Sequence, residues 1–218
     1  MSPPLPNVPL LVIDAASPSC FVGIWQSGQW LATAAPNAAA LEGLFVGVDQ
    51  CLCDANLSLQ DIQGFAHNQG PGSILGIRLS AMAIRTWRAL PAWKNAPVWV
   101  YGGLHFAAGA WALENSGIQP TVISEFRHGR WNLLPAGADT IRAAESEALA
   151  DLPEPLIYLR QRKAWQEPPS HAIEWRPTMQ DHAATLNLPG LLKPSEEPGV
   201  YVVEEATFAK WDAKPHQG

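Results

Sequence analysis

The first part of the chain alternates apolar runs with short turn sequences. Residues 8–13 form a continuous apolar run rich in branched side chains, which is typical of a strand buried on both faces. Residues 20–26 alternate in polarity, and Ser27-Gly28 separates them from a third run at 30–33. Because such a dipeptide favours a hairpin turn, the pattern predicts three strands that open the domain as an antiparallel meander.

Helices and strands then alternate along the chain. Capping residues and helical spacing of apolar positions mark the helices, and short apolar runs mark the strands. The order of elements predicts an α/β layer with a mixed sheet. The predicted elements are a helix from Asn37, a strand at 62–67, a helix at 73–90, a strand at 97–101 and a helix at 102–114.

The second half of the chain is less regular. Residues 121–126 and 131–134 predict a hairpin around His128-Gly129. Closely spaced prolines interrupt any long helix in the remainder, and a last strand is predicted at 199–204.

Composition and charge narrow the function classes. Of the 218 residues, 47% are hydrophobic and 16% are charged, which is typical of a folded globular chain. The formal net charge of −6 argues against a stand-alone nucleic-acid-binding protein, since such proteins need excess cations to displace counterions from phosphate. No apolar run approaches the ~20 residues of a membrane span, and the first residues lack a signal-peptide pattern. A cytoplasmic location without membrane attachment is therefore expected.

Metal and nucleophile motifs are missing from the sequence. Cys51 and Cys53 share a predicted helix without a second cysteine pair, and the histidines form no His-Glu-x-x-His motif. No serine has the Gly-x-Ser-x-Gly context of a nucleophile. Glu125 and His128 could form an acid–base pair, but they flank the predicted hairpin turn. We expect no metal site, no catalytic residue and no peptidase activity.

A glycine-rich turn at 69–78 is the most distinctive local sequence. Gly70 and Gly72 allow a tight turn, and Ser73 is a natural N-cap for the helix that follows. Such a turn can hold phosphate, with Asp14 at the end of the first strand nearby. The turn lacks the Gly-Lys-Ser/Thr ending of a P-loop, so a tight turn that starts a buried helix is favoured.

A stripe of small residues lies on the first predicted helix. Ala40, Gly43 and Gly47 share this stripe. A second stripe is expected to face the core, and it consists of Leu41, Leu44, Phe45, Val48 and Leu52. Each internal glycine costs a helix about 1 kcal/mol relative to alanine, which suggests that a second helix approaches closely. That helix could belong to the same chain or to a partner.

Several segments of the sequence resemble the bacterial TsaB (YeaZ) family. They occur in the family's order, cover about the first half of the chain, and include the Gly-Pro-Gly-Ser motif with its Gly-x-Arg ending. The end of the chain resembles the closing strand of the family. The matching segments are 10–14, the hairpin ending near Trp25, 59–62, 70–78, 97–108 and 197–201.

The resemblance implies an actin-like, ribonuclease-H-like α/β fold with two subdomains, the second of them reduced. On that basis residues 1–115 form the first subdomain, and residues 198–214 return to it. Residues 116–197 form the second, diverged subdomain.

The resemblance also implies a role. TsaB-type proteins are non-catalytic subunits that dimerise with the catalytic TsaD-type protein in the synthesis of threonylcarbamoyladenosine in tRNA, and a TsaE-type ATPase joins them. The chain is then a pseudo-enzyme without a cofactor of its own. In the complex, a nucleotide could bind at the subunit interface. It meets tRNA only through the complex and forms a homodimer when isolated.

The family builds its subunit interface from the two helices that follow the meander and the glycine-rich turn. Replacement of Gly43 or Gly47 by leucine is expected to abolish the complex and leave the fold intact. The predicted interface residues are Ala40, Leu41, Gly43, Leu44, Gly47, Ile77, Arg78, Ala81 and Arg85.

The alternative is an enzyme of the actin-like fold. An ATP-dependent phosphotransferase or ATPase would place Asp14, Gly70, Gly72 and Ser73 around the phosphates. Binding of ATP and magnesium to the isolated chain distinguishes the two hypotheses.

Overall fold

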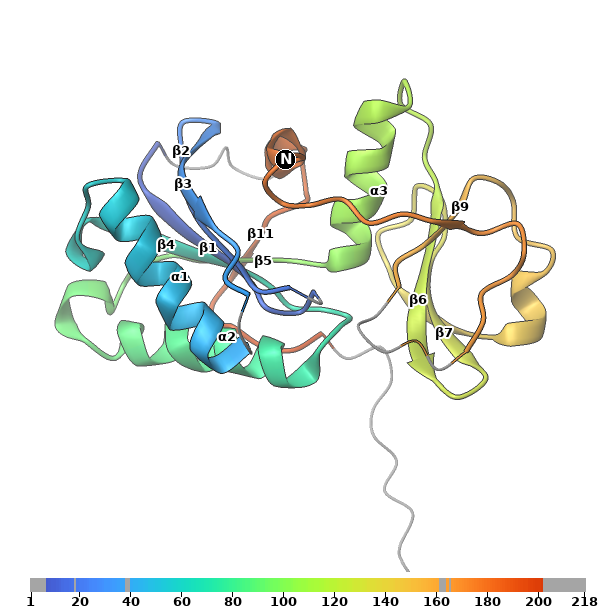
Figure 1. Ribbon diagram of the computed structural model, residues 1–218, viewed down its shortest axis with the longest axis horizontal. Helices are drawn as coiled ribbons and strands as arrows, with labels where there is room; N and C mark the ends of the chain where they lie inside the picture. The colour runs from blue at the N-terminus through green and yellow to red at the C-terminus, as the bar shows by residue number, and fades with distance from the viewer. Residues whose placement is uncertain (1–6, 18, 38–39, 161–163, 165, 202–218) are drawn as a thin grey trace, which may run out of the picture.

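The computed structural model describes residues 7–17, 19–37, 40–160, 164 and 166–201, and at residues 40 and 41 only the backbone. In this part of the chain, two β-sheets flank helix α3 (Gly103–Glu114), as Figure 1 shows. The mixed α/β architecture predicted from the sequence is confirmed.

Sheet A carries the opening meander. Strand β1 lies in its middle, antiparallel to β2 and parallel to β4. Nearly all residues of these three strands are buried. The strand order is β11-β5-β4-β1-β2-β3. The strands are β1 (Leu10–Asp14), β2 (Phe21–Gln26), β3 (Gln29–Ala34), β4 (Gly64–Asn68), β5 (Val98–Tyr101) and β11 (Lys193–Ser195).

Helices α1 (Ala40–Asp54) and α2 (Ile74–Arg88) cover one face of sheet A and contact each other (Figure 1). Leu11, Ile13 and Leu44 belong to the core cluster on this face. The other face of the sheet packs against Phe106 of α3 and against the segment around the short helix η4 (Ala183–Asn187). Sheet A is therefore buried on both faces.

Sheet B forms the second lobe. Its strand order is β10-β9-β6-β7-β8, and Leu104 and Ala107 of α3 pack against one of its faces. Helix α3 thus contributes side chains to the cores of both lobes. The strands are β6 (Thr121–Arg127), β7 (Arg130–Leu134), β8 (Arg142–Glu145), β9 (Leu156–Tyr158) and β10 (Ile173–Glu174).

The return of the chain to sheet A begins earlier than predicted. Strand β11 pairs antiparallel with β5, and Met179 and Leu191 already belong to the core of sheet A. The boundary at 197 is therefore wrong, because residues between 179 and 195 already pack with the first lobe. The predicted last strand, 199–204, has no strand structure at 199–201, and its remainder lies outside the described residues.

The helices of the described ranges are all too short or too polar to meet the requirements of a membrane-spanning segment.

Candidate functional site

Asp14 closes β1, and its carboxylate is held by its own chain. Oδ1 accepts hydrogen bonds from the backbone N–H groups of Ala16 and Ser17, at 3.1 and 3.0 Å. Oδ2 accepts from the Ser17 hydroxyl, the Asn68 amide and the Tyr101 hydroxyl, at 3.2, 3.0 and 3.3 Å. A carboxylate with five donors organises the turn that surrounds it.

The glycine-rich turn packs tightly against the chain after β1. The backbone N–H of Ser73 donates to the Ala16 carbonyl oxygen at 2.9 Å, and a Cβ on Gly72 would lie only 2.4 Å from that oxygen. The Ser73 hydroxyl accepts from the backbone N–H of Gly76 and caps α2, as predicted. Gly70 adopts a φ of +107°, in the region that favours glycine.

Asp14, Gly70, Gly72 and Ser73 are therefore brought together, and the groups that a phosphate would need are used within the chain. This arrangement supports the structural role of the turn that the sequence favours over phosphate binding.

Groups suited to metal binding or nucleophilic catalysis are dispersed. Within the described ranges, no cluster of three or more His, Cys, Asp or Glu side chains could hold a metal ion. Burial raises the pKa of the Cys20 thiol to about 11 and that of Cys51 to about 12, and nearby aspartates add to both shifts, so both thiols stay protonated. Glu125 is buried beside Gln166, whereas His128 is exposed in the β6–β7 turn.

The predicted interface residues fall into two groups. Gly43, Leu44, Gly47, Ile77 and Ala81 are buried in the chain's own fold, so the expectation that they meet a partner directly is wrong. Their burial follows from the close packing of α1 and α2 on sheet A.

Arg78 and Arg85 are exposed, and Arg85 forms an ion pair with Glu197 at 3.3 Å. The side chains of Ala40 and Leu41 lie outside the described part of the structure.

Gly47 shows why the small-residue stripe faces inward. A Cβ at this position would lie 2.8 Å from Cγ2 of Val22 on β2 and 3.4 Å from the Pro36 ring. Gly47→Leu is therefore expected to lower the free energy of unfolding by about 2 kcal/mol, in contrast to the intact fold predicted from the sequence. Urea denaturation measures the effect. Gly199→Leu, at a position with open space around it, is the control, and equal stability of both variants would contradict this packing.

An apolar face remains exposed on the same two helices. It consists of Phe45 and Val46 on α1, which are 45% and 54% exposed, and of Ile74, Leu75 and Met82 on α2, which are 58%, 77% and 57% exposed. These five residues are called the α1–α2 face. The sequence placed Phe45 in the core, but its periodicity could not show which of two apolar stripes meets the sheet.

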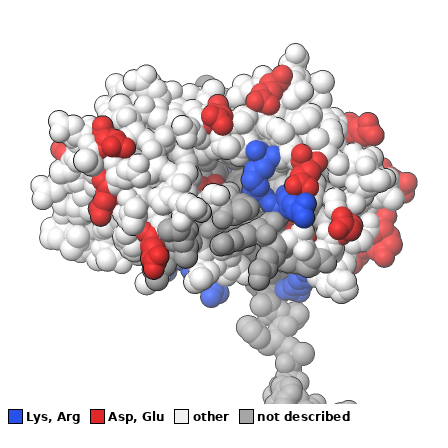
Figure 2. Space-filling model, in the orientation of Figure 1, with Lys and Arg blue, Asp and Glu red and all other residues white. Residues whose placement is uncertain are grey.

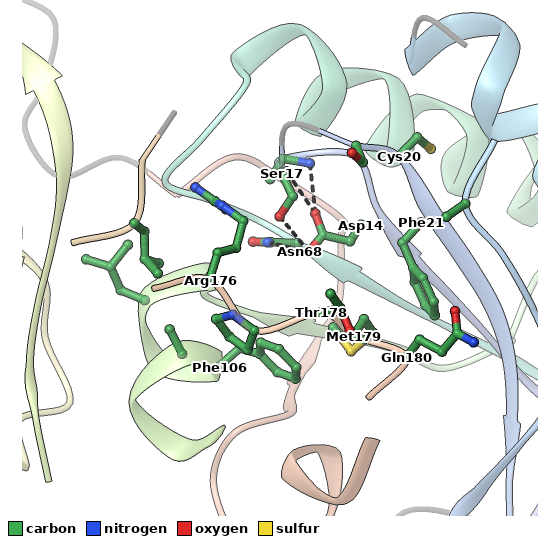
Figure 3. A pocket seen from close by; sticks show the side chains of 18 of the residues that line it. Asp14, Ser17, Cys20, Phe21, Asn68, Phe106, Arg176, Thr178, Met179 and Gln180 are labelled. Carbon is green, nitrogen blue, oxygen red and sulfur yellow. Dashed lines mark hydrogen bonds between the residues drawn. The ribbon is translucent and has the colours of Figure 1, made fainter. Parts of the chain in front are cut away.

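A cavity lies between the two lobes. It has a volume of about 350 Å³ and is lined from β1, β2, α3, sheet B and the segment around Arg176. In Figure 3 the Arg176 side chain lies at the cavity with its guanidinium turned to the side away from Ser17 and Asp14, and Phe106 and Met179 lie below it. In the view of Figure 2, a group of basic side chains lies where the two lobes meet. No local motif predicts this cavity, because its lining residues come from segments that are distant in the sequence.

Comparisons with known proteins agree with this architecture. No protein-family model and no curated protein matches the chain. A solved structure described as YeaZ from Pseudomonas aeruginosa is 17% identical, with a TM-score of 0.56 over 75% of this chain and 87% of that one. A second, described as an uncharacterized protein with similarity to peptidase YEAZ from Pseudomonas aeruginosa, is 18% identical, with a TM-score of 0.52 over 69% and 74%. The chain has the actin-like, ribonuclease-H-like fold of these YeaZ structures.

Proposed function

We propose that the chain is a TsaB-type, non-catalytic subunit that dimerises with a TsaD-type catalytic protein in tRNA threonylcarbamoyladenosine synthesis. The observation that carries the proposal is the α1–α2 face on a chain with the YeaZ fold. Exposed large apolar side chains on neighbouring helices are typical of protein–protein contacts, and helix faces are common docking elements. The Gly-Pro-Gly-Ser resemblance supports the same assignment.

The charges around this face fit a protein partner. Arg78 and Arg85 project from α2 beside the apolar side chains, while Glu42 and Asp49 are exposed on α1. Charged side chains around an apolar centre form the polar rim of many interfaces. We propose that the TsaE-type ATPase and tRNA are met only through the complex, in the cytoplasm, and that the isolated chain pairs with itself through the same face.

The Asp14 site favours this role over the ATP-dependent alternative. Five donors of the chain already occupy the carboxylate, so binding of a phosphate-bound magnesium ion would require the turn to rearrange. Calorimetry with ATP and magnesium on the isolated chain tests this, and tight binding with turnover would reverse the assignment.

The partner role is tested by charge insertion on the α1–α2 face. Phe45→Glu and Met82→Glu are each expected to weaken the complex with the TsaD-type protein of the same organism about thirtyfold or more, because a charged carboxylate loses its hydration in the apolar centre of the interface. Both positions are half-exposed, so the fold persists. Affinity is measured by calorimetry, and the mass of the complex by light scattering.

Leu113→Glu is the matched control, since Leu113 is an apolar residue on α3 with 51% of its side chain exposed. It is expected to bind as the unchanged chain does. Full binding by the folded Phe45→Glu, Met82→Glu double variant would reject the α1–α2 face as the interface. No binding by the unchanged chain would reject the TsaD-type partner itself.

A further inference from the structure

The cavity between the lobes has the size and walls of a small-molecule site. Its volume of about 350 Å³ lies at the lower end of the range for ligand pockets. Phe21, Phe106 and Met179 form apolar parts of its wall, and each is less than a tenth exposed. All three belong to the core of sheet A, so the wall is formed before any ligand arrives. A pre-formed wall lowers the entropy cost of binding.

Arg176 brings a cation to this cavity. Within the described residues, one N–H group of the Arg176 guanidinium donates a hydrogen bond to the carbonyl oxygen of Arg160. No ion pair of the described part joins it to Asp14, although the Asp14 carboxylate lines the same cavity and helps to keep the guanidinium protonated. Burial lowers the pKa of Arg176, because protein atoms replace part of the water around the guanidinium. A half-buried guanidinium with free N–H groups is suited to binding an anion.

The other charges of the cavity limit the kind of anion. Asp14 and Asp181 both line it, so among the described residues Arg176 is the one cationic lining residue against two carboxylates. A polyphosphate would carry more negative charge than one guanidinium can offset. A cationic ligand would find Asp14 already occupied by five donors. A single carboxylate matches the planar fork of the guanidinium, and an apolar body matches the wall.

We propose that this cavity binds a small monocarboxylate with an apolar or aromatic body, its carboxylate on Arg176 and its body against Phe21, Phe106 and Met179. Because the lining residues come from both lobes, a bound carboxylate bridges them. The site is separate from the α1–α2 face, so the proposal goes beyond the partner role and does not depend on it.

The test compares acids with their uncharged amides on the full chain. The probes are butanoate, hexanoate and 3-phenylpropanoate, each paired with its amide, and binding is followed by ligand-observed NMR and thermal shift. At least one acid is expected to bind with saturation, about tenfold or more tightly than its amide. Arg176→Met is expected to remove this preference, and Arg176→Lys to restore part of it without the two-pronged contact.

Arg142→Met, which removes an exposed arginine from β8, is the control for net charge and is expected to keep the preference. Failure of all three acids to bind would overturn the proposal. So would unchanged preference in Arg176→Met, or tighter binding of magnesium–ATP than of any acid.

Discussion

Gly76→Ala is expected to destabilise the chain by about 3 kcal/mol or more, although alanine normally stabilises a helix by up to ~1 kcal/mol relative to glycine. Gly76 lies in the first turn of α2, and an added Cβ would lie 1.8 Å from the carbonyl oxygen of Ala15 and 2.8 Å from its carbonyl carbon. Both are backbone atoms, held in place by the Asp14 turn. The methyl group must therefore push α2 away from β1.

The measurement is the free energy of unfolding from urea denaturation. Leu75→Ala is the control in the same turn, and its side chain is 77% exposed, so a change within about 0.5 kcal/mol is expected. A free energy of unfolding of Gly76→Ala equal to that of the unchanged chain, or higher, would contradict the close approach of α2 to the chain after β1.

The opening of the chain could be predicted from sequence because its signals are local. The hairpin at Ser27-Gly28 forms as expected, with both residues at positive φ, and α2 begins at its predicted cap, Ser73. In the second half the hairpin of β6 and β7 forms as predicted, but the other strands could not be predicted in this way. Strands β9, β10 and β11 are two or three residues long and are stabilised by pairing with distant segments.

The periodicity of the sequence also could not predict which side of α1 faces the core. Gly47 and Leu44 both face the core, because the helix lies close enough to β2 for Val22 to fill the space of a side chain. Phe45 consequently points outward. Two apolar stripes on one helix give the same pattern whichever stripe meets the sheet, and only the shape of the sheet decides between them.

The Asp14 turn and the cavity at Arg176 also differ in how far the sequence could predict them. The sequence identified the turn residues around Asp14 because they lie in recognisable motifs, and the structure showed that their polar groups serve each other. Arg176 lies in a proline-rich region without a motif, and its place opposite Asp14 depends on how the chain returns from sheet B to sheet A. Such a site emerges only from the fold.

His67 gives the second large expected effect, a loss of stability at acidic pH. It lies in β4 with no exposed surface, and neither ring nitrogen has a hydrogen-bond partner within the described residues. Burial lowers its pKa from 6.5 to about 4, against a smaller opposing contribution from the backbone of Asn68. Above pH 6.5 the ring is neutral in both the folded and unfolded states and contributes no pH dependence. Between pH 6.5 and 4 the unfolded chain binds a proton that the folded chain excludes, so stability falls by about 3 kcal/mol.

His67→Leu removes this proton-binding group and leaves an apolar side chain of similar size between Ile13 and Val100, its neighbours on β1 and β5. The variant is expected to be at least as stable as the unchanged chain at pH 7, because a buried ring without hydrogen bonds is replaced. Its loss of stability between pH 6.5 and 4 is expected to be smaller by about 3 kcal/mol, as measured by urea denaturation at several pH values. His128→Leu, at an exposed position, controls for the loss of a histidine. Equal pH dependence of the unchanged chain and His67→Leu would show that the buried ring takes up its proton without unfolding.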